Sequence, residues 1–365
     1  MKRFIQRHGK RGIGLLAAAG VLGLLLGQPL FAQSLNPARL ITASGVASPI
    51  TLNILIGKYL GYYEKEGLQF ELGTMGATGT GPIIQGLTQG RFEFGTVDAT
   101  TLLSLDVQGE DVPLKAFYVY TQDHPEVMAV PDGSPVKSYS DLKGKKIGVR
   151  SIDRDRYAKA ILSTAGVDPE SANYIPVGIG SGPAIALRRS EVQALSLFDV
   201  DMARVESLGV KLRYLPMPEE WRKIQGPLVI TSEKMIKEHP DRVIGFARAV
   251  AKGTLFTLTN PEAAVKIFYK MYPEALPKGK TREESIKDTL FILNARLPKL
   301  TIENRKVKKW GYLEPESWRL SAELLGYKGK VRKPYTAFYT NQFIEAINQF
   351  APEAVINQAK SYKID

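Results

Sequence analysis

Cysteine is absent from the 365 residues of this sequence, and histidine occurs only three times, as His8, His124 and His239. The lack of cysteine excludes disulfide frameworks, cysteine–zinc sites, iron–sulfur clusters, cysteine nucleophiles and a lipid-modified N-terminal cysteine. So few histidines disfavour any mechanism that needs several imidazoles. Long runs of like charge are also missing, so the sequence does not require a nucleic-acid partner.

What remains has the composition of a globular protein, with 44% hydrophobic and 24% charged residues. The length suggests two domains of ordinary size. The net charge of +12 is unevenly spread, because the first 32 residues contain five basic residues and no acidic one. The remaining +7 is a moderate excess in which both signs are mixed.

The N-terminal segment has the order of a secretory signal peptide. Residues 2–11 are basic, residues 13–26 are apolar apart from glycines, and Ala32 precedes the polar Gln33. The apolar run is shorter than the roughly 20 residues that a membrane-spanning helix needs, which disfavours the alternative of a membrane anchor. We therefore expect cleavage of residues 1–32 after Ala32 and release into the periplasm.

After this segment, strand and helix patterns alternate. Apolar and alternating stretches predict strands at 38–43, 68–72, 92–97, 114–120, 146–150, 174–177 and 192–198. Helical periodicity lies between them, at 49–66, 82–89, 98–108, 154–165 and 183–189. From residue 233 the strand signals fade, and helices are expected at 240–259, 261–271, 283–295, 316–325 and 341–350. This order is typical of an α/β protein with parallel sheets covered on both faces and a helical C-terminus.

The sequence contains one internal echo. Gly79-Thr80-Gly81-Pro82-Ile83-Ile84 matches Gly180-Ser181-Gly182-Pro183-Ala184-Ile185, and each copy reads strand, glycine loop, proline-started helix and strand. Coincidence between two α/β units that both need tight turns is one interpretation. The other is a pair of similar lobes that each aim a helix N-terminus at a shared cleft.

Such helix ends would suit a polar or anionic small molecule. The first amides of a helix lack partners within it and carry partial positive charge, and glycine lets the backbone approach a ligand closely. Ser48 would begin a third helix of this kind, and Thr100 and Thr101 would add hydroxyl groups. The loop at 76–81 lacks the lysine of a phosphate-binding loop and the spacing of a dinucleotide fingerprint, so nucleotide binding is disfavoured.

Four segments resemble the periplasmic substrate-binding proteins of ABC importers, in the class that handles nitrate, taurine, alkanesulfonates and thiamine pyrimidine precursors. Gly61-Tyr62-Tyr63-Glu64-Lys65-Glu66-Gly67-Leu68 is similar to the family's "GYFEKEGL", and the segment 141–149 is close to "DLKGKKIGV". Residues 87–94 and 186–194 resemble "AL-x-x-G-x-x-D" and "AL-x-x-G-x-V-D-A". Glu93 and Gln193 replace the usual aspartates, and Ser190 replaces a glycine.

The resemblance implies a fold and a domain organisation. We expect the two-lobe periplasmic-binding-protein fold (type II), α/β, with mostly parallel sheets, two hinge crossings and a helical C-terminus. Lobe one would comprise 35–124 plus 232–365, and lobe two 125–231. The lobes would close on a ligand by a hinge. Tyr62 and Tyr63 are expected to pack a helix end, and Lys143 to Lys146 to form a solvated turn.

Transferring the family's pocket by position points to the loops that follow strands. The candidate ligand-binding residues are Ser44, Ser48, Gly79, Thr80, Gly81, Asp98, Thr100, Tyr120, Arg150, Ser151, Gly180, Ser181, Phe198 and Asp199. No catalytic residue and no metal ligand is expected among them.

Several of these residues have a second interpretation. Arg150 could clamp a carboxylate or sulfonate, or pair with Asp153 or Asp155. Asp98, Asp199 and Asp201 could bind an ammonium group, cap helices or line a hinge, and capping is favoured for Asp98 and Asp199. The aromatic residues could sandwich a ring or fill the core, with core favoured for any single one: Tyr118, Tyr120, Phe198 and Trp221.

The expected function is that of a periplasmic solute-binding component of an ABC importer. It would be a monomer that binds a small organic anion, a carboxylate or sulfonate with or without an aromatic ring, and delivers it to a permease driven by an ATPase. No cofactor, no nucleic acid and no enzymatic activity are expected. Alternatives are a binding protein for a thiamine pyrimidine precursor or a flavin, a sensor subunit for a membrane kinase, and an enzyme of the same fold. In the family, such enzymes use a cysteine-rich motif with histidine, which this sequence lacks.

Overall fold

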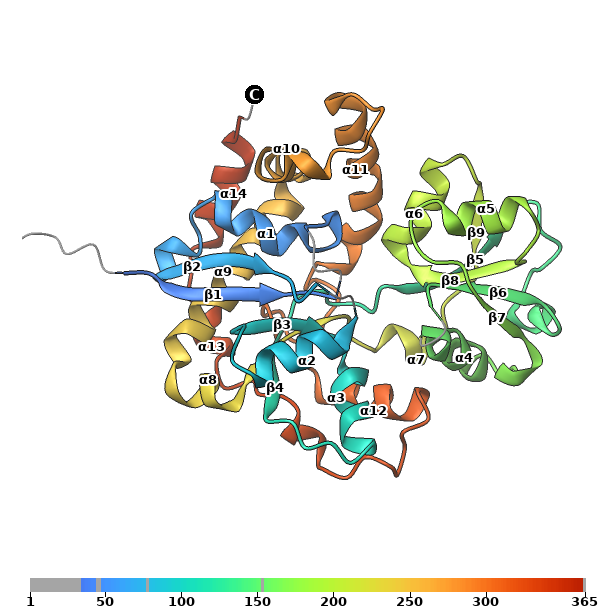
Figure 1. Cartoon of the computed structure of the whole chain (residues 1–365), viewed down its shortest axis with the longest axis horizontal. Helices are drawn as coiled ribbons and strands as arrows, with labels where there is room; N and C mark the ends of the chain where they lie inside the picture. Colours follow the sequence, from blue (N-terminus) through green and yellow to red (C-terminus); the bar gives the residue numbers. More distant parts are fainter. Residues whose placement is uncertain (1–33, 44–46, 77–78, 152–153, 364–365) are drawn as a thin grey trace, which may run out of the picture. The chain divides into compact units, whose positions relative to one another are not determined.

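The structure is a computed structural model that describes residues 34–363, except 44–46, 77–78 and 152–153. The expected signal peptide lies outside the described residues. The strands of the described chain form two five-stranded sheets, and contacts join both sheets and their helices into one unit from residue 35 onward (Figure 1). We call the first sheet with its helices lobe one and the second sheet with its helices lobe two.

The sheet of lobe one has the spatial order β2-β1-β3-β10-β4. Its strands are β1 (Asn36–Ile41), β2 (Leu68–Gly73), β3 (Phe94–Val97), β4 (Leu114–Val119) and β10 (Leu228–Ser232). β1 pairs in parallel with β2 and β3, whereas β10 is antiparallel to both β3 and β4. Four strands therefore run in one direction and β10 in the other.

The sheet of lobe two repeats this pattern, in the order β7-β6-β8-β5-β9. Its strands are β5 (Glu126–Pro131), β6 (Lys146–Val149), β7 (Asn173–Pro176), β8 (Ala194–Phe198) and β9 (Leu212–Tyr214). β5 is antiparallel to β8 and β9, and the other pairs are parallel. The expected mostly parallel direction is confirmed, but each sheet is mixed. The reversed strands, β5 and β10, were not predicted, because neither lies between two helical patterns of the sequence.

Helices cover both faces of each sheet. Lobe one carries α1 (Leu52–Tyr59), α2 (Thr80–Thr88), α3 (Ala99–Val107), α8 (Glu233–Glu238), α9 (Pro240–Thr259), α10 (Pro261–Met271), α11 (Arg282–Arg296), α12 (Pro315–Leu324), α13 (Ile344–Ile347) and α14 (Pro352–Ser361). Lobe two carries α4 (Asp155–Thr164), α5 (Gly182–Arg188), α6 (Asp199–Ser207) and α7 (Glu219–Arg222). After β10 the described chain adds helices and only isolated bridges, so the helical C-terminus is confirmed. None of the described helices has the length and apolarity needed to cross a membrane.

Alternating side chains of the strands supply a separate core to each face. In lobe one, Leu40 and Phe94 pack with α9 and α10 on one face, while Ile41 and Val97 pack with α2 and α3 on the other. Tyr63 is buried here and stacks on Phe70, with ring centroids 4.4 Å apart, as expected for a residue that packs a helix end. The sheets are therefore buried on both faces, as the sequence predicts.

The chain passes between the sheets twice, once from β4 to β5 and once from α7 to β10. The two crossings lie side by side, because the amide of Gly226 donates to the carbonyl of Thr121 at 3.0 Å and the amide of His124 donates to that of Ile224 at 3.0 Å. A Cβ atom at Gly226 would lie 2.7 Å from the Thr121 carbonyl oxygen and 2.8 Å from that of Asp123. Only glycine permits this approach without displacement of the backbone.

The internal echo of the sequence is a structural repeat. Gly90 and Ser190 follow α2 and α5, and both adopt the left-handed conformation, with φ of 68° and 57°. The residues that replace the family's aspartates also have matching roles. Glu93 accepts from the amide of Arg39 in β1 at 2.8 Å, and Gln193 accepts from the amide of Lys146 in β6 at 3.0 Å. Each side chain thus joins the strand after the echo to the neighbouring strand of its own sheet.

Candidate functional site

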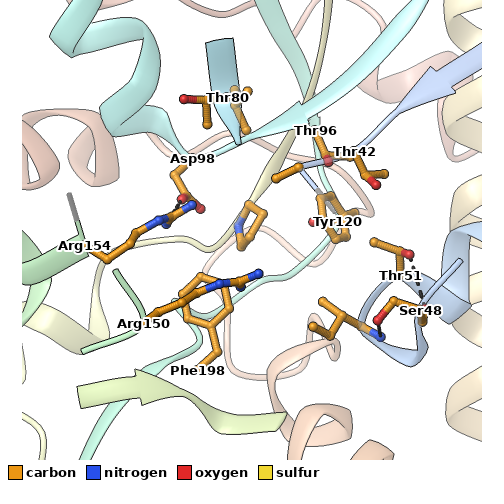
Figure 2. Close-up of a pocket in the computed structure, with 14 residues that line it drawn as sticks. Thr42, Ser48, Thr51, Thr80, Thr96, Asp98, Tyr120, Arg150, Arg154 and Phe198 are labelled. Carbon is orange, nitrogen blue, oxygen red and sulfur yellow. Dashed lines mark hydrogen bonds and ion pairs between the residues drawn. The ribbon is translucent and has the colours of Figure 1, made fainter. Parts of the chain in front are cut away.

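A cavity of about 80 Å³, which we call the inner pocket, lies where strands of both sheets end. Lobe one contributes Asp98 after β3 and Tyr120 after β4, and lobe two contributes Arg150 after β6 and Phe198 at the end of β8. Figure 2 shows these side chains around the pocket, with the guanidinium of Arg150 extending from the lobe-two side toward its centre. This is the edge at which open α/β sheets commonly bind ligands.

A larger cavity of about 480 Å³, the outer groove, adjoins the inner pocket. Ser48, Ile50 and Arg150 line both cavities. The outer groove continues over Gly180 and Ser181 at the start of α5 and over the first turns of α6, and residues of α10 and α11 form its other side. The N-terminal ends of both echoed helices therefore face a cavity, since Thr80 of α2 lines the inner pocket.

The structure brings together most of the residues predicted from the sequence. Six of them line the inner pocket: Ser48, Thr80, Asp98, Tyr120, Arg150 and Phe198. Gly180 and Ser181 line the outer groove. Gly79, Gly81 and Ser151 are described but line neither cavity, and Ser44 lies outside the described residues.

Four polar residues of the inner pocket were missed by the site prediction: Thr42, Thr51, Thr96 and Arg154. The threonines lie next to the predicted loops, at the ends of strands or helices. This position is the one sequence feature that could have indicated them as pocket residues. Arg154 falls in the loop that the resemblance pointed to, but as a charged residue before an amphipathic helix it has no distinguishing signal. Its partner, Asp98, lies 56 residues earlier.

Asp98 is held by two side chains of lobe two. Arg154 Nη1 donates to Asp98 Oδ2 at 2.9 Å, and the Tyr157 hydroxyl donates to the same oxygen at 3.0 Å. Burial alone would raise the pKa of Asp98, but the nearby Arg154 charge and these hydrogen bonds bring it below its usual value. Asp98 occupies the N-cap position of α3 without a capping hydrogen bond from its side chain. The capping prediction was wrong, because a buried carboxylate gains more from the guanidinium than from a backbone amide.

Thr100 lines a separate, water-sized cavity of about 10 Å³ beside this pair, together with His124, Tyr157 and Trp221. The hydroxyls of Thr100 and Tyr157 lie 3.1 Å apart, so the predicted ligand-binding Thr100 contacts lobe two. His124 packs against Trp221 with ring centroids 5.0 Å apart, and Trp221 is thus a core residue rather than a ring platform. Burial lowers the pKa of His124 to about 4.

Asp199 is a structural residue in this arrangement. Arg296 at the end of α11 binds it through Nε and Nη2, at 2.9 Å to Oδ2 and 2.6 Å to Oδ1, and both side chains are buried. The residue is the first of α6 and lines neither cavity. Asp199 therefore joins α6 to α11 through this ion pair and is not a simple cap, and its contact with a ligand stays a prediction.

Arg150 lines the inner pocket and has no ion-pair partner among the residues that the structure describes. No carboxylate oxygen of the described residues lies within 4 Å of it, and Asp155, one of the alternatives considered, pairs with Lys159 at 3.4 Å. Asp153 lies outside the described residues. The guanidinium of Arg150 therefore remains available to an oxygen acceptor in either cavity.

Two of the four aromatic candidates line the inner pocket, and the other two do not. Tyr120 and Phe198 line the pocket, whereas Tyr118 is fully buried against Gly311, where a Cβ atom would meet its ring at 2.2 Å. Burial raises the pKa of Tyr120 above its ordinary range, so its hydroxyl stays protonated. Among the described residues, no group of three or more histidine or acidic side chains is placed to hold a metal ion.

Comparison with known proteins places this geometry in context. The model of a family described as "NMT1/THI5 like" matches residues 48–264. The riboflavin-binding protein RibY of Chloroflexus aurantiacus is 24% identical over 294 residues, which covers 78% of this chain and 79% of that protein. A 4-amino-5-hydroxymethyl-2-methylpyrimidine phosphate synthase of Legionella pneumophila is 22% identical over 252 residues, covering 66% and 76% respectively.

Solved structures share the fold at lower identity. The periplasmic nitrate-binding protein NrtA of Synechocystis PCC 6803 superposes with a TM-score of 0.63 at 12% identity, covering 90% of this chain and 99% of that one. The periplasmic aliphatic sulphonate-binding protein SsuA of Escherichia coli gives a TM-score of 0.60 at 16% identity, with coverage of 83% and 91%. The fold expected from the sequence, the two-lobe periplasmic-binding-protein fold, is confirmed.

Proposed function

Because the chain belongs to the NMT1/THI5-like family and has the fold of the periplasmic binding proteins, we propose that it is the extracytoplasmic solute-binding component of an ABC importer. A monomer would capture a small molecule between lobe one (35–124 plus 232–365) and lobe two (125–231) and deliver it to a permease driven by an ATPase. Export would follow from the signal peptide at 1–32. Differential affinity of the ligand for the closed state would drive closure.

The ligand is a small organic anion, a carboxylate or sulfonate. The observation that carries this choice is Arg150, whose guanidinium lines both cavities and forms no ion pair within the described part of the chain. Its planar fork donates two parallel hydrogen bonds to a carboxylate or sulfonate. The hydroxyls of Ser48, Thr51 and Thr80 add neutral donors around the same space.

A flavin or a thiamine pyrimidine precursor is the second candidate ligand. The rings of Tyr120 and Phe198 line the inner pocket and could contact a planar heterocycle. The relative named for riboflavin binding and the relative named as a pyrimidine phosphate synthase support this candidate.

We propose binding without chemical conversion, although one relative is named as a synthase. The chain has no cysteine, and His124 is buried outside the inner pocket, with its Nδ1 accepting from the amide of Glu126 at 3.2 Å. A solute incubated with the protein should be recovered unchanged by mass spectrometry. Formation of 4-amino-5-hydroxymethyl-2-methylpyrimidine phosphate would contradict this proposal.

Arg150→Ala provides the test of the anion site. Thermal-shift screening of the mature chain against organic acids, sulfonates, pyrimidines and flavins identifies a bound solute, and calorimetry then measures its affinity. For an anionic solute we expect Arg150→Ala to weaken binding by about tenfold or more, the scale of a charge-assisted hydrogen-bonded pair. Lys145→Ala, which removes a cation from an exposed turn, should leave the affinity unchanged. Equal effects of the two substitutions would exclude an anion clamp at Arg150.

A further inference from the structure

Asp201, in the first turn of α6, is a buried carboxylate whose Oδ2 has no hydrogen-bond partner in the described chain. Its residue is 7% exposed, and it lines the outer groove. Among the described residues, its Oδ2 is buried and accepts no hydrogen bond. Asp199, two residues earlier, has both oxygens bound by Arg296, so a lack of donors near this turn does not explain the difference.

The surroundings of Asp201 favour a ligand as the missing partner. Buried polar groups in proteins nearly always have a hydrogen-bond partner, and an unmet buried acceptor costs about 1–3 kcal/mol. Arg150 and Arg204 line the same groove, and their charges act on Asp201, although neither is paired with it within 4 Å. Burial nevertheless raises the pKa of Asp201, which is the behaviour of a carboxyl that is poorly solvated.

The volumes of the two cavities also favour a ligand that extends into the outer groove. The inner pocket, at about 80 Å³, is small beside the roughly 300–1,000 Å³ of typical small-molecule sites, whereas the outer groove has about 480 Å³. Ser48, Ile50 and Arg150 belong to both, so a ligand seated in the inner pocket can continue into the groove without a break.

We propose that the outer groove is the second half of the ligand site, where Asp201 accepts hydrogen bonds from hydroxyl groups of the ligand while Arg150 donates to one of its oxygens. This inference rests on the proposed solute-binding function. Of the two candidate ligands, it favours the second, a flavin, which carries a polyhydroxylated chain, over a simple carboxylate or sulfonate. A neutral hydroxyl fits better than an ammonium group, because the positive charges of Arg150, Arg204 and Arg296 already act on this carboxylate.

Asp201→Asn tests the role of the carboxylate, and Asp111→Asn is its control. Asp111 is an exposed carboxylate that is paired with Lys333 and lines neither the inner pocket nor the outer groove. Calorimetry with riboflavin, ribitol, taurine and nitrate compares ligands with and without hydroxyl donors. We expect riboflavin or ribitol to bind the wild type, Asp201→Asn to weaken that binding at least tenfold, and Asp111→Asn to change it less than threefold.

Ligand-free unfolding in urea separates this role from a structural one. Asp201→Asn should be as stable as the wild type or more stable, because it removes a buried and unpaired charge. Equal affinity of Asp201→Asn and the wild type, marked destabilisation of the ligand-free variant, or binding of taurine or nitrate alone would overturn the proposal. The last result would leave the solute-binding function intact. If none of the four solutes binds, the polyhydroxylated ligand class is overturned. The wider thermal-shift screen and Arg150→Ala would then decide the solute-binding function itself.

Discussion

The junctions β3–α3 and β8–α6 place an aspartate at the same point of each lobe and use it differently. Asp98 binds Arg154 and Tyr157 at the wall of the inner pocket. Asp199 binds Arg296 outside both cavities, and the arginine is only 1% exposed. The first pair lines a cavity, whereas the second joins α6 to α11. An acidic residue after a strand therefore does not reveal its role until its partner is known.

The largest expected effect comes from breaking the buried pair. Asp199→Ala leaves the guanidinium of Arg296 without a counter-charge, and we expect a loss of about 3–5 kcal/mol in the free energy of unfolding. Urea unfolding measures this loss. The double substitution Asp199→Ala with Arg296→Met should recover much of it, because neither charge of this pair then remains buried. A single-variant loss below about 1 kcal/mol would contradict a structural role for the pair.

Each junction also has a buried titratable neighbour, and the pKa values of these two neighbours are shifted in opposite directions. Burial raises the pKa of Glu126, which is paired in register with Phe198, to about 7, and burial lowers that of His124, beside Asp98, to about 4. The ordinary values are 4.5 and 6.5. Glu126 stabilises the fold while protonated and loses this contribution as the pH rises through 7. His124 stabilises the fold while neutral and loses this contribution as the pH falls from 6.5 toward 4.

The two contributions should nearly cancel in the wild type, and single variants should separate them. Between pH 7 and pH 5, we expect His124→Gln to gain about 2 kcal/mol in stability from Glu126, and Glu126→Gln to lose about 2 kcal/mol through His124. The slope of the unfolding free energy against pH is the measurement. Parallel slopes in the two variants would show that these groups do not dominate the titration.

Asp98→Asn should cost less than the loss of Asp199. The amide oxygen can still accept from Arg154 and Tyr157, so only the charge is lost, and we expect a destabilisation of about 1–2 kcal/mol in the ligand-free protein. Urea unfolding beside Asp199→Asn gives a direct comparison of the junctions. A larger loss of stability in Asp98→Asn than in Asp199→Asn would mean that the Asp98 pair, and not the Asp199 pair, has the main structural role.

The smallest expected effect concerns the left-handed residues that precede the two junctions. Ser190→Gly should raise stability by about 1 kcal/mol, because glycine adopts positive φ without the Cβ penalty that serine pays. Gly90→Ser should lower stability by a similar amount for the same reason. Thermal unfolding of both variants checks the prediction, and a neutral Ser190→Gly would mean that the serine side chain offsets its strain.

Much of the fold could be predicted because its signals are local. The helices α9 and α10 begin at Pro240 and Pro261 as expected, since proline fixes the first helical turn and supplies no unused amide. The strands β5 and β10 escaped prediction, because their places in the sheets depend on antiparallel pairing with distant strands. β5 ends at Pro131, and the turn-forming residues Pro131 and Gly133 weaken the strand pattern at this end.

The site was predictable in outline and not in its pairings. Positions after strands correctly indicated Arg150, Asp98 and Phe198 as pocket residues, because this property follows from sheet topology. The partners of the aspartates could not be inferred, since Arg154 and Arg296 lie 56 and 97 residues away in the chain.

The position of β10 has a consequence for how the chain acquires its structure during synthesis. β10 separates β3 from β4, yet it is made only after every strand of lobe two. Lobe two draws its five strands from one continuous stretch, so all of them are made before β10. Lobe one must hold an unfilled slot in its sheet until residues 228–232 emerge, and such delayed long-range pairing is slow and leaves strand edges open to wrong partners. The nascent protein is therefore most vulnerable to aggregation in the interval between the completion of lobe two and the arrival of β10.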